Sequence, residues 1–131
     1  MDLVILSTTA VTLISAFFSQ AGKGFAKKAG EAAWKKTEKL FNYVTLKIKG
    51  NMSAEEALSD LKKTPDDLDA RAALRVQLRK ILSEDNEFAK ELEKIVNTIK
   101  VAGGDIIIQQ FTMSGGRADS VIQLGKGNVE K

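Results

Sequence analysis

The sequence predicts an all-α protein: a bundle of four to five helices followed by a C-terminal β-type tail, either amyloid-forming or a hairpin. Ala, Leu, Lys and Glu dominate the middle of the chain, and apolar residues recur there at helical spacing. After residue 102 the composition changes to Ile, Val, Gln and Gly. A chain of 131 residues can bury one modest core. We therefore expect two parts, a helical bundle over residues 1–102 and a β-type tail over residues 103–131.

The first predicted helix lies in residues 3–22, which carry no charge. At about 1.5 Å per residue, residues 3–18 would span roughly 24 Å and the whole segment roughly 30 Å, the thickness of a bilayer core. Because Asp2 precedes the segment and no small-residue cleavage pattern follows it, a secretory signal is a poor explanation. Two interpretations stay open, a membrane-active helix and the buried central helix of the bundle. Both can hold at different times.

The second predicted helix, within residues 21–50, is cationic and amphipathic. Residues 1–50 carry eight lysines and three acidic residues. Such a helix can lie on anionic lipid, and the alternative is an ordinary solvated lysine face on a bundle helix. The uncharged segment before it favours membrane contact, and Trp34 fits either an interfacial anchor or a core residue. The lysines that would face lipid are Lys23, Lys27, Lys28, Lys35, Lys36 and Lys39.

Three further helices are predicted in the middle of the chain, and we interpret them as structural. Ser53 and Glu56 have the spacing of a capping box, which opens a short helix. Thr64 before Pro65 predicts the start of the next helix, with acidic residues in its first turn. A Gly-Gly pair at residues 103–104 ends the last helix and serves as a hinge. The apolar stripe of that last helix consists of Phe88, Leu92, Ile95, Val96 and Ile99.

The composition excludes several classes of catalytic site. The chain has no Cys and no His, which removes disulfides, Cys/His zinc sites and imidazole catalysis. No P-loop, G-x-G-x-x-G, HExxH or GxSxG pattern occurs. The acidic residues Asp66, Asp67 and Asp69 fall in the first turn of a helix, where the helix dipole explains them. We therefore expect a protein that is not an enzyme and that holds no cofactor or metal.

A row of arginines follows the acidic cluster at helical spacing, and it could touch phosphate. Its members are Arg71, Arg75 and Arg79. Acidic residues lie directly before the row and the row has no aromatic partners in the sequence pattern, so we do not expect it to bind nucleic acid.

The tail has the composition of a cross-β segment. Residues 105–113 are rich in Ile, uncharged after the first residue and free of proline. A turn at residues 114–117 separates them from a second short segment, residues 120–125. In a stack of identical copies, Gln amides would form ladders while Ile, Val and Leu form a dry interface between sheets. The residues assigned to this amyloid motif are Ile106, Ile107, Ile108, Gln109, Gln110, Phe111, Val121, Ile122, Gln123, Leu124 and Gly125.

The end of the tail carries a resemblance to a known family of motifs. Residues 122–125, Ile-Gln-Leu-Gly, followed by Asn128, resemble the core of the amyloid signalling motifs shared by RIP homotypic interaction motifs of necroptosis proteins, fungal prion-type effectors and their bacterial counterparts. The layout of an apolar N-terminal helix, a helical bundle and such a motif resembles bacterial Bell-domain proteins. Those are analogues of the fungal HeLo and HELL membrane-permeabilising cell-death domains.

The resemblance implies an amyloid-controlled, membrane-permeabilising effector of regulated cell death in bacterial immunity. An NLR-like receptor with a matching motif would template the tail into a homotypic fibril. Clustered bundles, cytoplasmic at rest, would then release the first helix into the inner (plasma) membrane. The implied partners are further copies of the chain, that receptor and anionic membrane lipids. The side chains that would insert are Leu3, Val4, Ile5, Leu6, Leu13, Ile14, Phe17 and Phe18.

Two other classes of protein stay open. One is a non-toxic signalling adaptor or scaffold that assembles through its C-terminal amyloid motif. The other is a constitutive membrane-anchored protein whose tail forms a plain hairpin against the bundle. Deletion of residues 2–19 would separate effector from adaptor, because we expect an effector to lose toxicity and keep fibril formation, whereas an adaptor would lose solubility.

Overall fold

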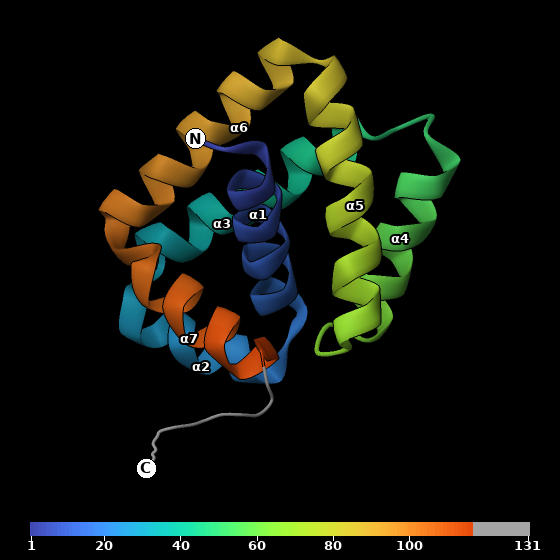
Figure 1. Ribbon diagram of the computed structural model, residues 1–131. Helices are drawn as coiled ribbons and strands as arrows, with labels where there is room; N and C mark the ends of the chain where they lie inside the picture. The colour runs from blue at the N-terminus through green and yellow to red at the C-terminus, as the bar shows by residue number, and fades with distance from the viewer. Residues whose placement is uncertain (117–131) are drawn as a thin grey trace.

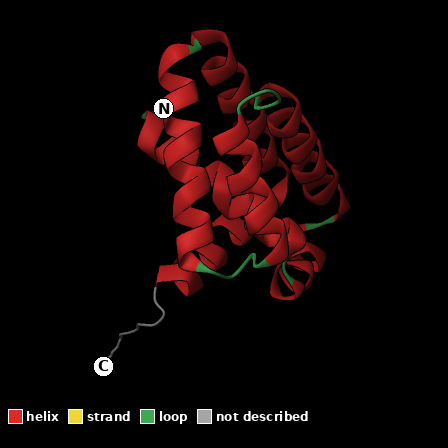
Figure 2. Ribbon diagram, turned by 90° about the vertical axis from the view of Figure 1, so that its right-hand side faces the viewer, coloured by secondary structure: helices red, strands yellow, loops and turns green. Residues whose placement is uncertain are grey.

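The computed structural model describes residues 1–116, which are helical apart from short connections (Figures 1 and 2). No strand occurs in these residues, so the predicted all-α class is confirmed for this part of the chain. The second predicted β segment, residues 120–125, lies beyond the described range, whereas residues 114–116 of the predicted turn are helical. The elements are α1 (Leu3–Phe18), α2 (Gln20–Ala29), α3 (Glu31–Lys47), α4 (Met52–Lys63), α5 (Leu68–Glu84), α6 (Asn86–Ile99), the short π-helical stretch η1 (Lys100–Gly104) and α7 (Asp105–Gly116).

Helix α1 lies at the centre of the bundle, with the other helices around it (Figure 1). Asp2 caps its N-terminus, since the carboxylate accepts hydrogen bonds from the backbone N–H groups of Val4 at 2.6 Å and Ile5 at 3.4 Å. Within residues 6–16 every residue except Thr8 is buried. The uncharged N-terminal segment is therefore the buried central helix of the bundle in this structure.

The sequence predicts one cationic helix within residues 21–50, but the structure has two, α2 and α3. Gly30 separates them with a φ of 103°, a conformation that L side chains rarely adopt. A second break, at Ser19, turns α2 by 88° from α1. Gly22 permits the close approach of these two helices, because a Cβ atom there would overlap the backbone of Ala16. The predicted lipid-facing lysines thus lie on two helices instead of one.

Helices α4, α5 and α6 form where the sequence predicts helices, but two of their N-terminal caps are other residues. Asn51, rather than Ser53, caps α4 by accepting a hydrogen bond from the N–H of Ala54 at 3.1 Å. Asp67, rather than Thr64, caps α5. The apolar faces of these three helices supply much of the core around α1. Their buried residues include Ala54, Leu58, Leu61, Leu74, Leu78, Leu82, Phe88, Leu92, Val96 and Ile99.

Residues 105–116, which the sequence assigns mostly to a β segment, form helix α7 instead. Gly103, with a φ of 111°, turns the chain so that α7 packs on α1 and α2. Ile107 and Phe111, one helical turn apart, enter the core, whereas Gln109 is exposed. The strand preference of Ile is overridden here by burial of this i, i+4 pair. The packed bundle thus includes residues beyond 102, and a β form of the tail in an assembled state stays a prediction.

Candidate functional site

The side chains predicted to enter a membrane are buried in the middle of α1 and exposed at its start. Leu6, Leu13 and Ile14 have at most 1% of their surface exposed, whereas Val4 and Ile5 are 50% and 55% exposed. Full burial stabilises each of the first three by roughly 1.5–3 kcal/mol, so α1 can leave only for another apolar environment. The three remaining members of the set, Leu3, Phe17 and Phe18, are half-buried.

The length of α1 bears on whether this helix could cross a membrane. No single helix within residues 1–116 is both long and apolar enough to cross a membrane, while α1 and α2 taken together meet that requirement by length and composition, across the bend between them.

Four aromatic side chains gather where the end of α1 meets α3. The ring centre of Phe17 lies 5.0 Å from that of Trp34 and 5.9 Å from that of Phe41. Phe18 meets Phe41 edge to face at 4.9 Å, and Lys62 of α4 places its Nζ 5.3 Å from the Phe41 ring centre. Each such ring pair stabilises the fold by about 0.5–1.5 kcal/mol beyond the effect of its buried area. The cluster therefore stabilises the packing of the end of α1 against α3. Sequence reasoning missed the cluster, although the seven-residue spacing of Trp34 and Phe41 places both on one helix face.

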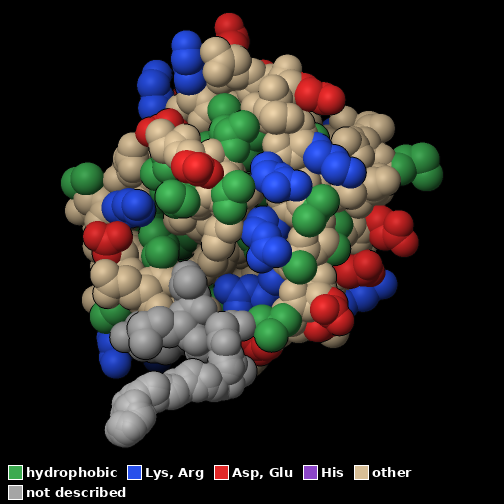
Figure 3. Space-filling model, in the orientation of Figure 1, with side chains coloured by type: hydrophobic (Ala, Val, Ile, Leu, Met, Phe, Trp, Pro, Cys, Tyr) green, Lys and Arg blue, Asp and Glu red, His purple; other side chains and the backbone are tan. Residues whose placement is uncertain are grey.

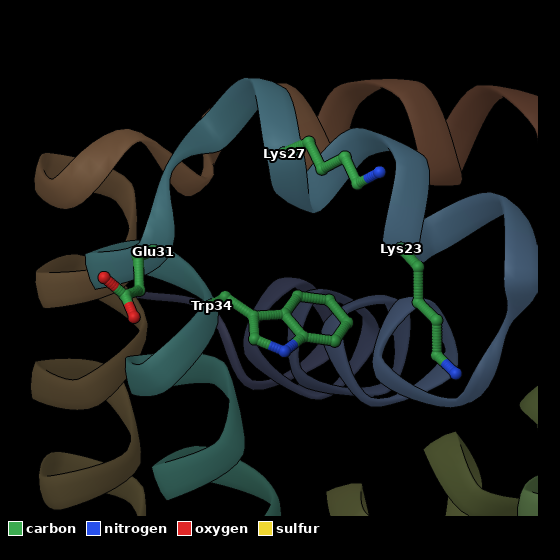
Figure 4. A pocket seen from close by; sticks show the side chains of 4 residues that line it. All are labelled: Lys23, Lys27, Glu31 and Trp34. Carbon is green, nitrogen blue, oxygen red and sulfur yellow. The ribbon is translucent and has the colours of Figure 1, made fainter.

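A pocket of about 350 Å³ opens between α2 and α3, and it brings together two predicted lipid-facing lysines and Trp34 (Figure 4). Lys23 and Lys27 project from α2 one helical turn apart, while Glu31 and Trp34 come from α3. The indole ring lies in the middle of the view, with Glu31 to its left, Lys23 to its right and Lys27 above it. The lysines are exposed and Trp34 is half-buried. We call this site the Lys–Trp pocket.

The other predicted lipid-facing lysines do not line the Lys–Trp pocket. Lys35 forms an ion pair with Glu31 at 3.6 Å, in which both side chains are largely exposed. A surface pair of this kind contributes little stability. Lys28 and Lys39 are exposed, and Lys36 is half-buried. The structure therefore separates Lys23 and Lys27 from the rest of the set.

Arg71 of α5 contacts α7 and connects it to the bundle. Its Nη2 donates a long hydrogen bond, 3.5 Å, to the carbonyl oxygen of Phe111, and its guanidinium lies 5.4 Å from the centre of the Phe111 ring. Burial is the main cause that lowers the pKa of Arg71; nearby Asp66 acts in the opposite direction, and Arg75 adds to the lowering. Ser19, where α1 ends, donates a hydrogen bond to Asp66 at 3.1 Å. Helices α1, α5 and α7 therefore meet around Arg71.

The predicted arginine row is divided between the interior and the surface. Arg75 and Arg79 line a groove of about 300 Å³ between α5 and the N-terminal half of α1. Figure 3 shows basic side chains running down the middle of this face. Arg71 is buried against α7, so within the row only Arg75 and Arg79 are open to solvent.

The remaining predicted residues belong to the acidic cluster at the start of α5 and to the amyloid motif. Asp67 accepts a hydrogen bond from the N–H of Asp69 at 3.1 Å, which is a capping role. Within residues 1–116 no group of three or more acidic side chains is placed to hold a metal ion. Ile106 and Ile108 are half-buried in α7. Six motif residues lie outside the described part of the chain: Val121, Ile122, Gln123, Leu124, Gly125 and Asn128.

No protein-family model, curated protein or solved structure matches this chain. What the arrangement can do therefore follows from its own residues. The apolar helix α1 is enclosed by the bundle, and α7 forms part of that enclosure. The Lys–Trp pocket places two cations beside an aromatic side chain.

Proposed function

We propose that the protein is an amyloid-controlled effector that permeabilises membranes during regulated cell death. The observation that carries the proposal is the packing of α7 on α1. The first part of the predicted amyloid tail thereby covers the most apolar helix of the described chain. A tail that joins a fibril would remove Ile107 and Phe111 from the core and uncover α1. Fibril formation and release of α1 would then be coupled.

The residues of α7 suit two conformations. As a helix, the segment buries Ile107 and Phe111 on one side. As a strand, alternate side chains would point to opposite faces, and identical copies above and below would satisfy the backbone hydrogen bonds. Clustering of bundles raises the effective concentration of the released helices at a membrane. Lipid would then replace the core around Leu6, Leu13 and Ile14, so that their exposure to water is avoided.

The proposed partners follow from the same mechanism. Further copies of the chain would extend the fibril, and an NLR-like receptor with a matching motif would start it. Residues 122–128 would pair first because they carry the core of the motif that the receptor would match. The protein would be cytoplasmic at rest and would act at the inner (plasma) membrane, where its basic N-terminal half favours anionic lipids.

The test uses dye-filled vesicles that contain phosphatidylglycerol, and full-length protein seeded with fibrils of peptide 103–131. Deletion of residues 2–19 is a poor variant, because α1 is the centre of the bundle under every interpretation. Val4→Lys with Ile5→Lys is better, since both positions are about half exposed and tolerate a polar side chain. A charge carried to the middle of a bilayer costs about 3 kcal/mol. We expect this variant to fold and form seeded fibrils, but to lose at least about tenfold in leakage rate.

The matched control is Leu46→Lys with Met52→Lys, which adds the same charge at positions that are 67% and 82% exposed on α3 and α4. This control should leak like the unchanged protein. Equal leakage by the Val4/Ile5 variant would show that α1 does not insert. A Gln123→Pro chain should neither join the fibril nor leak, because proline removes a backbone donor from the stack.

An adaptor or scaffold is the second candidate, and one observation favours it. Helix α1 is buried on all sides within residues 6–16, as a permanent core helix would be. An adaptor of this kind would form seeded fibrils with no leakage from any vesicle, and its bundle would keep its helical circular dichroism in the fibril.

A further inference from the structure

The two lysines of the Lys–Trp pocket have no acidic partner within residues 1–116. The ion pairs in these residues join the N-terminal amine to Glu93 and Lys35 to Glu31. No Asp or Glu occurs in the sequence between Asp2 and Glu31, so α1 and α2 contribute no negative charge. Glu31 is the one acid among the described residues that line the pocket, and in Figure 4 it lies to the left of the indole, while Lys23 lies to the right and Lys27 above. The rim formed by Lys23 and Lys27 is therefore free to take an anion.

The other wall of the pocket is aromatic and fixed. Trp34 is half-buried and stacks on Phe17 with 32° between the ring planes. Phe17 in turn packs against Phe18 and Phe41. No atom of the described residues accepts a hydrogen bond from the indole nitrogen of Trp34. A tryptophan with an apolar body and a free polar edge is suited to the headgroup level of a membrane.

We infer that the Lys–Trp pocket docks the closed bundle on a membrane by binding the headgroup region of an anionic phospholipid. Lys23 and Lys27 bind the phosphate, and Trp34 contacts the glycerol and upper acyl region. Charge complementarity selects this occupant, because the rim is cationic while the wall is apolar. The inference deepens the proposed membrane role and rests on it, but it concerns the first, reversible contact of the otherwise cytoplasmic protein with the membrane, before any fibril forms. Among the six predicted lipid-facing lysines, it assigns the lipid contact to Lys23 and Lys27.

The test uses the only tryptophan of the chain as its probe. Unseeded full-length protein is mixed with vesicles whose acyl chains carry bromine atoms, which quench tryptophan fluorescence on contact. One arm contains phosphatidylglycerol with phosphatidylcholine, a second contains phosphatidylcholine alone, and a third adds inorganic phosphate without lipid. We expect quenching of Trp34 in the first arm, little in the second, and no spectral change in the third.

The decisive variant is Lys23→Gln with Lys27→Gln. The matched control, Lys90→Gln with Lys94→Gln, removes two exposed lysines with the same i, i+4 spacing from α6. Loss of two basic residues at an anionic surface should weaken vesicle binding about tenfold to thirtyfold for the pocket variant. The control should bind like the unchanged protein. Circular dichroism before and after heating establishes that both variants fold.

Three results would overturn the inference. Protein that sediments with anionic vesicles while Trp34 stays unquenched binds through another surface. Equal weakening of the pocket variant and the α6 control means that only net charge matters. A spectral change with inorganic phosphate alone assigns the pocket to a soluble anion. None of these three results depends on leakage from vesicles. Lipid docking by the pocket and the proposed effector activity can therefore fail separately.

Discussion

At the scale of single residues, the centre of α1 contains a hydroxyl that lowers stability. Ser15 is fully buried, and its Oγ has no hydrogen-bond partner within residues 1–116. By contrast, the hydroxyl of Ser7 donates to the carbonyl oxygen of Val4 at 3.1 Å. A buried polar group without a partner costs about 1–3 kcal/mol. The Ser15 hydroxyl therefore reduces the free energy that holds α1 in the bundle.

Replacing Ser15 by Ala should stabilise the bundle. The substitution removes the unsatisfied hydroxyl, and we expect the free energy of unfolding in urea to rise by about 1 kcal/mol. Ser7→Ala is the control, because it makes the same change on the same helix but removes a hydroxyl that has a partner. An equal rise in both variants would assign the effect to the helix propensity of Ala.

Residue-level reasoning from sequence failed mainly at helix caps. Ser53 and Thr64 are good capping residues by type, yet Asn51 and Asp67 cap the two helices. Several neighbouring residues could serve at each start, and the packing of the helix against the core selects among them. The aromatic contact between Phe17 and Trp34 depends on how α3 lies against α1, so periodicity within one helix does not reveal it.

At the scale of elements, two of the three described glycines with positive φ, Gly30 and Gly103, differ in their surroundings. A Cβ atom on Gly103, just before α7, would lie 2.6 Å from the carbonyl oxygen of Ala29, whereas one on Gly30 would meet nothing within 4 Å. Strain at such backbone positions is about 1–3 kcal/mol for a residue other than glycine. Gly103→Ala and Gly30→Ala therefore both strain the backbone, but only Gly103→Ala also produces a clash.

Gly103→Ala should accordingly destabilise the protein more than Gly30→Ala. We expect the difference to appear in urea unfolding and in hydrogen exchange, where the amides of α7 lose protection in the Gly103 variant alone. Gly30→Ala serves as the control for backbone strain. Equal losses in both variants, with α7 still protected, would show that the contact between Gly103 and Ala29 has no role in docking α7.

The elements that could be predicted from sequence are those in which the spacing of apolar residues matches the helix face that is buried in the structure. The stripe of α6 and the uncharged run of α1 both indicate helices that the structure contains. The sequence alone does not decide the conformation of residues 105–113 in the bundle, because Ile-rich composition fits a strand while the i, i+4 pair of Ile107 and Phe111 fits a helix. Contact with α1 decides between them, and a local pattern does not contain that contact.

At the scale of the whole molecule, Arg71 couples the tail to the bundle, and its removal should ease assembly. Arg71→Met keeps most of the side-chain volume but removes the hydrogen bond and the cation–π contact with Phe111. Weakening the docking of α7 by about 1–2 kcal/mol would raise its open population roughly fivefold to thirtyfold. We expect faster hydrogen exchange in residues 105–111 and a shorter lag before thioflavin fluorescence rises.

Arg75→Met provides the comparison for this prediction. Arg75 lies one turn further along α5, is exposed, and lines the groove beside α1. Its replacement should leave both the exchange of α7 and the lag time unchanged. A similar shortening in both variants would point to the lower positive charge, and no change in either would mean that Arg71 does not restrain α7.

The arrangement of the whole could be predicted only in outline. An all-α bundle with a hidden apolar helix follows from composition and charge. The enclosure of that helix by the start of the tail does not, because the tail is far from α1 in sequence and the two share no local signal. The Lys–Trp pocket likewise arises from the break at Gly30, which brings the lysines of α2 over Trp34 of α3.

The central position of α1 also sets the order in which the chain can fold during its synthesis. Among the described helices, α1 is translated before its neighbours α5, α6 and α7, which come at the end of the series. At about 5–20 residues per second, α1 waits for roughly 5–20 s before α7 emerges. During that interval each nascent chain carries an uncovered apolar helix. We therefore expect chaperones to bind nascent chains until α7 has emerged, and prematurely terminated chains to aggregate.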